Sequence, residues 1–324
     1  MSRLSPTQVN LCACLLAISF ATATAAQQTE LLGSAAGSVV FIYDGTTEPC
    51  VDSPPATILL PLGTGFVSGI PKKGLAPDSP TWTGVKLLIT AKHVVRGRSK
   101  VIIRLNRDDN AGFTCFPMEL KWDGSQENSF VSEKPEVDLA AMYLPKIPHT
   151  DPWVIDYSLI LDAKSMSDWQ VEEGTDVFTI GYLFGYSGQK KNYPVKKFGK
   201  IALLTEESWC CPDPLHPDQL QKAYLVELQN VPGLSGAPVL LQSPRFILLR
   251  EGALTLRHNP PMVVGVIKDL LKAPISPSQV ISQGVAAVEP GGELKGLLQQ
   301  VARQVTTRLQ PDLELELPGT PPPK

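Results

Sequence analysis

Residues 230–240, with the sequence NVPGLSGAPVL, place Ser235 between Gly233 and Gly236, with apolar residues on either side. Glycines permit the tight turn that lifts a single hydroxyl out of a sheet. Such a turn also directs the N–H groups of Gly233 and Ser235 toward one point beside the hydroxyl, where a developing oxyanion would sit. Glycine–serine turns are common in β-proteins, so this stretch predicts only half of an acyl-transfer site. The base must lie elsewhere in the chain.

The composition indicates a globular, mostly β protein. Of the 324 residues, 43% are hydrophobic and 19% are charged, which is enough apolar residue to bury a sizeable core. Thirty prolines and 25 glycines separate Val- and Ile-rich runs, a pattern typical of short strands joined by turns. The net charge is −3 and no basic run exceeds a dipeptide, so nucleic acid is not expected as a partner.

The N-terminus resembles a secretory signal peptide. Arg3 precedes an apolar segment at 11–20 that is too short to span a bilayer, and small residues follow at 21–26. The apolar segment follows Cys12 and Cys14 instead of preceding them, which argues against a lipoprotein signal. We therefore predict a signal peptide over 1–26 and a secreted or periplasmic protein. No later stretch is long enough for a membrane span, so no stable insertion is expected once the signal is removed.

Removal of the signal leaves Cys50, Cys115, Cys210 and Cys211. Four cysteines in an oxidising compartment allow three pairings, and the sequence alone does not choose among them. Pairing Cys50 with Cys115 leaves the adjacent Cys210 and Cys211 as a vicinal bridge or as thiols. A metal site formed by that adjacent pair and His216 matches no zinc spacing, so no metal is expected.

Two more residues with acid–base chemistry stand at the ends of apolar runs. A strand predicted over 85–95 delivers His93 at its end, and a strand predicted over 136–144 carries Asp138 at its mouth. A single histidine in an apolar context is more often a core residue than a catalyst. An aspartate at the start of a buried run needs a hydrogen-bond partner, and an imidazole is one such partner. The order His93, Asp138, Ser235 favours a shared site over two structural side chains.

Residues 90–94 (TAKHV), 137–140 (VDLA) and 232–238 (PGLSGAP) resemble the three signature blocks of trypsin-like serine peptidases. The motifs are most similar to those of bacterial secreted and periplasmic members. The resemblance covers about residues 35–309, through short motifs. The resemblance implies an all-β fold of two packed antiparallel six-stranded β-barrels with a C-terminal helix. We expect the peptidase domain at 27–309, with halves at about 35–150 and 151–290.

The resemblance also implies the roles of the site residues. Ser235 is the expected nucleophile, His93 the general base and acid, and Asp138 the residue that orients the imidazole. The expected activity is that of an exported serine endopeptidase acting on a peptide or protein, without a cofactor. The alternative is an inactive barrel of the same fold that binds peptides or a partner protein.

By the same resemblance, the substrate pocket is expected to be built from residues 227–231 and 264–268, with Gln229, Val264, Gly265 and Val266 as the candidate contact residues. Because no acid occupies position 229, we expect a preference for a small or medium apolar residue before the scissile bond. The alternative is that Glu227 faces the pocket, which would overturn this preference.

Three positions depart from the family pattern. Leu234 stands where the family usually has Asp or Asn, so it cannot form the ion pair that activates digestive zymogens. Ala237 replaces a glycine, and its methyl group is expected to be tolerated, although it can narrow the site. Lys92 beside the histidine is unusual, and we expect it to point to solvent.

The C-terminal segment predicts a helix over 292–309, with an apolar face formed by Leu294, Leu297, Leu298, Val301 and Val305. This face suits packing on a barrel better than binding a partner. The tail at 310–324 is proline-rich and is predicted to be disordered. No peptide-binding module is expected after the helix.

Overall fold

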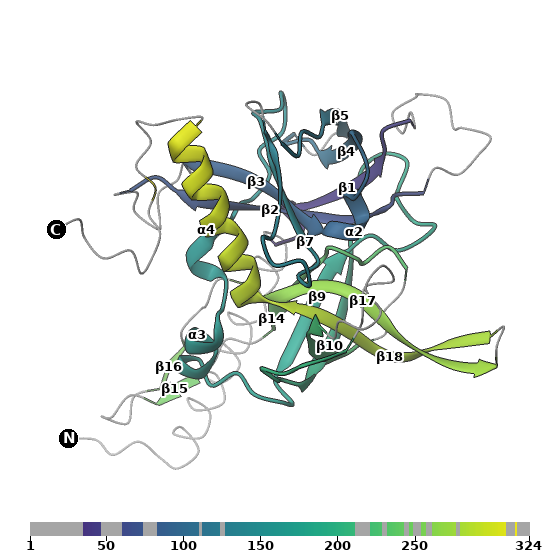
Figure 1. Ribbon diagram of the computed structural model, residues 1–324, viewed down its shortest axis with the longest axis vertical. Coiled ribbons are helices and arrows are strands. Elements are labelled where there is room, and N and C mark those ends of the chain that lie inside the picture. The colour runs from purple at the N-terminus through teal and green to yellow at the C-terminus, as the bar shows by residue number, and fades with distance from the viewer. Residues whose placement is uncertain are drawn as a thin grey trace, which may run out of the picture.

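The computed structural model describes residues 35–46, 60–73, 83–109, 112–123, 127–210, 221–228, 232–242, 246–248, 254–256, 261–276, 279–308 and 315. Within these residues the protein is mostly β, with two packed halves and a long C-terminal helix, α4 (Figure 1). The predicted signal peptide, and the predicted tail apart from residue 315, lie outside the described residues.

An eight-stranded sheet forms the first half, in the order β5-β4-β1-β2-β3-β7-β6, with β8 paired to β2. The elements of this half are β1 (Val39–Asp44), β2 (Gly63–Pro71), β3 (Gly84–Ala91), α2 (Lys92–Val95), β4 (Lys100–Asn106), β5 (Phe113–Glu119), β6 (Ser129–Val131), β7 (Leu139–Tyr143) and β8 (Ile155–Asp156).

Side chains of β1 point alternately to the two faces of this sheet and enter two different core clusters. Val40 and Ile42 join the cluster enclosed by the first sheet. Val39, Phe41 and Tyr43 point the other way, into a cluster shared with the second half. Because successive side chains of a strand point to opposite faces, one strand stabilises both the curled sheet and the contact between the halves.

A closed six-stranded barrel, in the order β10-β13-β18-β17-β14-β9, forms the second half. Its elements, with the short segments beside it, are η1 (Tyr157–Leu159), α3 (Ala163–Asp168), β9 (Asp176–Gly181), β10 (Val195–Leu203), β11 (Ser208–Cys210), β12 (Gln221–Lys222), β13 (Tyr224–Glu227), β14 (Pro238–Leu241), β15 (Phe246–Leu248), β16 (Leu254–Leu256), β17 (Val263–Ser276) and β18 (Gln279–Pro290).

The predicted all-β class with two packed halves and a terminal helix is confirmed. In detail, the second half is the closed six-stranded barrel, whereas the first half is a curled eight-stranded sheet. The segment 106–135, which has little periodicity, contains β5 and β6. Their partners β4 and β7 supply the hydrogen bonds that the local sequence does not signal.

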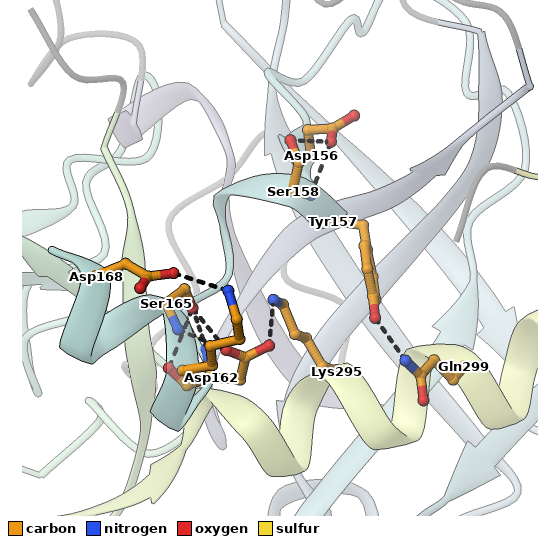
Figure 2. A network of polar contacts seen from close by, with 9 residues as sticks. Asp156, Tyr157, Ser158, Asp162, Ser165, Asp168, Lys295 and Gln299 are labelled. Carbon is orange, nitrogen blue, oxygen red and sulfur yellow. Dashed lines mark hydrogen bonds and ion pairs between the residues drawn. The ribbon is translucent and has the colours of Figure 1, made fainter. Parts of the chain in front are cut away.

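Helix α4 (Gly291–Arg308) follows β18 and runs from the barrel up along the first sheet (Figure 1). The five residues of its predicted apolar face are all at most 1% exposed. They belong to the cluster that also contains β1, β2 and β3 side chains, so the helix fastens the two halves together. Lys295 and Gln299 of α4 also bond to Asp162 and Tyr157 of the segment that connects the halves (Figure 2).

Among the described residues, no helix has both the length and the apolar character needed to cross a membrane.

Candidate active site

His93 and Asp138 meet because of the register between β3 and β7. Ala91 pairs with Leu139 at the end of this antiparallel ladder, so the residues just beyond the two strands lie side by side. The N–H of Lys92 donates to the Asp138 carbonyl at 3.1 Å, and the N–H of His93 donates to Asp138 Oδ1 at 2.9 Å. Nδ1 of the His93 ring lies 2.6 Å from Asp138 Oδ2. His93 stands in the short helix α2 instead of on the strand predicted there.

The environment of His93 raises its pKa above the ordinary value. Burial alone lowers it, but the hydrogen bond and charge of Asp138, together with the charge of Asp269, outweigh burial, while Lys268 opposes them. The His93 side chain is 50% exposed and that of Asp138 is 13% exposed. The imidazole therefore has one nitrogen fixed by a carboxylate, and half of the side-chain surface is open to solvent.

The turn that bears Ser235 is fixed against β2 and β3. The N–H of Thr64 donates to the Ser235 carbonyl at 2.9 Å, and the Thr64 hydroxyl donates to the Gly233 carbonyl at 2.7 Å. Gly236 has φ +87°, and a Cβ there would lie 2.1 Å from the Thr64 carbonyl oxygen and 2.9 Å from the Ala91 nitrogen. Ala91 ends β3 two residues before His93, so the turn that carries Ser235 packs against the strand that delivers the histidine.

Gly233 is also required by its surroundings. Its φ is +102°, and a Cβ would lie 2.4 Å from the ring of Tyr182. Within the described residues, the N–H groups of Gly233 and Ser235 donate to no backbone or side-chain acceptor. An oxyanion site needs N–H groups without an acceptor of their own. No hydrogen bond joins the Ser235 hydroxyl to His93 in the part of the chain that the structure describes, and such contacts often tighten only when substrate binds.

The three departures from the family pattern have physical roles. Leu234 is 1% exposed and Ala237 is 0% exposed, and both pack inside the second barrel, against Gly181. The Ala237 methyl group therefore faces the core. Lys92 is partly exposed, and its ammonium group donates to the Pro135 carbonyl at 2.9 Å and to the Val137 carbonyl at 2.8 Å. Lys92 thus holds the segment that carries Asp138.

Two further charged residues, Lys268 and Glu289, are linked to the main chain of Asp138. Sequence reasoning missed this link, because it placed Lys268 only at the end of the pocket segment 264–268 and did not single out Glu289. The Asp138 N–H donates to Glu289 Oε1 at 2.8 Å, and Lys268 Nζ lies 2.8 Å from the same oxygen. The side chains of Lys268 and Glu289 are 6% and 1% exposed. The available signal was a charged residue directly after an apolar run in each of two strands, Lys268 after 263–267 and Glu289 after 285–288, since buried charges require partners.

The predicted pocket residues are only partly described. Val264 and Val266 are buried in the cores, and a Cβ on Gly265 would lie 2.2 Å from the Glu289 carbonyl oxygen. The side chains of the two valines therefore face the interior. Gln229 lies outside the described residues.

Of the predicted disulfide cysteines, Cys50 and Cys211 lie outside the described residues, Cys210 ends β11, and Cys115 lies in β5. Within the described residues, no group of three or more His, Cys, Asp or Glu side chains is placed to hold a metal ion.

No protein-family model matches the chain, and no curated protein matches its sequence. Among solved structures, the active form of the Rv3671c protease from M. tuberculosis is similar at 21% identity and a TM-score of 0.47, over 84% of this chain and 83% of that one. The HtrA-type protease AlgW with a decapeptide is similar at 17% identity and a TM-score of 0.46, over 87% and 68%. The MamO protease domain from Magnetospirillum magneticum gives 14% and 0.43, over 84% and 97%. All three of these structures are named as proteases.

Proposed function

We propose that the protein is a serine endopeptidase in which His93, Asp138 and Ser235 form the catalytic triad. The observation that carries this proposal is the 2.6 Å contact between His93 Nδ1 and Asp138 Oδ2, on a strand end against which the Ser235 turn is packed. Geometry of this kind fixes the imidazole tautomer with Nε2 free to accept a proton.

In the proposed reaction the Ser235 hydroxyl attacks the peptide carbonyl while His93 Nε2 takes its proton. Asp138 stabilises the imidazolium and remains ionised. The N–H groups of Gly233 and Ser235 bind the oxyanion, a contribution of about 3 kcal/mol per donor in sites of this kind. His93 then donates the proton to the leaving amine, and water attacks the acyl-enzyme by the reverse sequence of proton transfers. We expect a small or medium apolar residue before the scissile bond.

Export to the periplasm or the medium belongs to the same proposal. Cys115 is disulfide-bonded, which supports an oxidising compartment. Cys50 is the partner we propose, and the apolar segment at 11–20 is the proposed signal core. Mass spectrometry of the secreted chain under non-reducing conditions tests both points, because it gives the mature N-terminus and the cysteine pairing together.

The test of activity is labelling of the purified mature chain with a fluorophosphonate probe at neutral pH. We expect labelling at Ser235 that is lost in Ser235→Ala. Ser167→Ala, which alters an exposed serine of α3, is the matched control and keeps full labelling. If Ser235 takes the label, fresh protein that has not met the probe is given a peptide library to define the residue preferred before the scissile bond.

A second candidate is a barrel that binds a peptide or a protein without cleaving it. The missing hydrogen bond between His93 and the Ser235 hydroxyl among the described residues favours this alternative. Folded, oxidised protein that resists the probe but retains a peptide from the library would support the binding protein and overturn the peptidase.

A further inference from the structure

Lys268 and Glu289 form a buried ion pair between neighbouring barrel strands. Lys268 lies in β17 where the pairing register with β18 shifts, between Ile267 and Asp269. Shifts of this kind redirect a side chain relative to the regular alternation of a strand. Lys268 thereby reaches Glu289 Oε1 at 2.8 Å, although it is Val266 that pairs with Glu289 in the ladder.

Burying two charges is costly, and well-packed apolar residues would serve the core as well or better. The pair is therefore not explained by stability alone. What sets it apart from a pair that only packs is the third partner, because Glu289 Oε1 also accepts the main-chain N–H of Asp138 at 2.8 Å.

The charges around the proposed triad explain why a lysine is needed. Burial raises the pKa of Glu289, while Lys268 and the Asp138 N–H favour its ionised form. The neighbouring Asp138 carboxylate disfavours a second negative charge. Lys268 neutralises Glu289, so a carboxylate can stay at this place without opposing the negative charge of Asp138.

The groups that face His93 come from several elements. Asp138 precedes β7, and Lys268 and Asp269 stand on β17. Glu289 on β18 reaches the ring only through Asp138, and Lys92 holds the same segment from α2. Glu289 thus contacts the main chain of Asp138 directly, while Lys268 contacts Glu289 and its charge also acts on the ring.

We infer that Lys268 and Glu289 are positioning residues for the His93–Asp138 pair: Glu289 fixes the main chain of Asp138, and Lys268 keeps Glu289 in place as the acceptor. The catalytic part of this inference rests on the proposed peptidase function. The positioning of His93 by way of Asp138 does not, and it can be measured without any reaction.

The test compares two double variants, K268M/E289Q and K268M/E289M. Both remove both charges, and glutamine and methionine have nearly the same length, but only glutamine offers an oxygen to the Asp138 N–H. Any difference between the two variants therefore reports the hydrogen bond and not the charge. NMR titration of the His93 ring is the first readout, with its signal among the four histidines assigned by His93→Gln. The second readout is the rate of fluorophosphonate labelling at Ser235.

We expect the His93 titration midpoint to be about one pH unit lower in K268M/E289M than in K268M/E289Q, because Asp138 is no longer held against the ring. We expect labelling of Ser235 to be at least about tenfold slower in K268M/E289M than in K268M/E289Q. Equal midpoints in the two folded variants would overturn the inference. If the natural chain takes no label at all, the peptidase proposal fails, while the titration still decides the positioning role.

Two further variants complete the design. Glu289→Asp keeps the charge and withdraws the acceptor by one methylene, so it should also lower the His93 titration midpoint and slow the labelling of Ser235 relative to the natural chain. This variant tests the inference even if K268M/E289M does not fold. K295M/D162N removes another ion pair, with an N–O distance of 2.7 Å, that joins α4 to the connecting segment. This control should leave the His93 midpoint unchanged, and an equal shift there would attribute the effect to general loosening of the fold.

Discussion

The main-chain N–H of Asp138 lies 2.8 Å from the carboxylate of Glu289, although 151 positions separate the two residues. Asp138 directly precedes β7 of the first sheet, and Glu289 belongs to β18, the last strand of the second barrel. The geometry of the His93–Asp138 pair therefore depends on how the two halves dock. Changes at the interface between the halves should reach the site before they unfold the chain.

Asp138→Asn should lower the labelling rate of Ser235 by about 10³–10⁴-fold, because an amide presents the wrong hydrogen-bond partner to Nδ1 and favours the wrong imidazole tautomer. The main-chain N–H of His93 can still bond to the amide oxygen, so the fold should survive. Asp156→Asn, at another aspartate that caps a short helix, is the control and should label normally. Equal loss in both variants, or unchanged labelling in Asp138→Asn, would remove Asp138 from the triad.

The raised pKa of His93 sets the pH dependence of labelling. The base must be neutral, so the rate should fall on acidification with a midpoint above about 6.5. Asp269→Asn removes a charge that raises this pKa, so the midpoint should move down, by less than about one unit because the site is half open to solvent. A midpoint that stays in place or moves up would show that Asp269 does not act on the ring.

Folding stability should have the opposite pH dependence at this residue. A pKa raised in the folded state means that the protonated His93–Asp138 pair contributes stability in full below about pH 6.5. That contribution is lost as the pH rises through the raised pKa. Urea unfolding of the natural chain and of His93→Gln at a series of pH values measures it, and the difference should shrink on the alkaline side.

The sequence predicted those parts of the site that depend on local backbone chemistry. The glycines around Ser235 predicted the turn. His93 and Asp138 lie at the ends of apolar runs that form β3 and β7. The apolar face of α4 could be predicted because a helix repeats every 3.6 residues. Each of these signals is contained in a stretch of about ten residues.

The parts that could not be predicted depend on contacts between distant strands. Lys268 reaches Glu289 only because the register shifts in β17, and no local pattern reports such a shift. The bonds of the Lys92 ammonium group to the carbonyls of residues 135 and 137 could not be predicted either, since those residues lie 43 and 45 positions away in the sequence. The eight-stranded first sheet could not be predicted for the same reason: β5 and β6 have little sequence periodicity, and they form because they pair with β4 and β7.

Gly236→Ala should destabilise the protein and disrupt the turn that carries Ser235. A methyl group there would be 2.1 Å from the Thr64 carbonyl oxygen, and the backbone has φ +87°. We expect a loss of about 3 kcal/mol in unfolding free energy, together with loss of labelling. Gly174→Ala is a matched control, because its φ is also +87° and no atom lies within 4 Å of the new methyl group. It should cost only about 1–2 kcal/mol, the backbone term alone, and keep labelling; equal costs in the two variants would show that the close packing of the Ser235 turn is not what requires glycine.

Lys295→Met should weaken the fold at neutral pH but not in strong acid. Lys295 lies 2.7 Å from Asp162 Oδ2, in the network that ties α4 to the connecting segment (Figure 2). Burial would raise the pKa of Asp162, but the bonds from Lys295 and Ser165 outweigh it and lower the pKa to about 2. A depressed carboxyl pKa contributes stability above the ordinary value of about 4, and this contribution disappears as the pH falls toward 2.

Urea unfolding at pH 7 should therefore show a loss of about 1 kcal/mol in Lys295→Met, a modest value because Asp162 is partly exposed. Near pH 2 the variant and the natural chain should unfold together. Lys164→Met is the control, because it breaks an exposed ion pair: the side chains of Lys164 and Asp168 are 87% and 61% exposed. It should change the free energy of unfolding by less than about 0.5 kcal/mol at either pH. A loss in Lys295→Met that persists undiminished at pH 2 would show that the lysine acts through its packing against Tyr157 and not through the charge of Asp162.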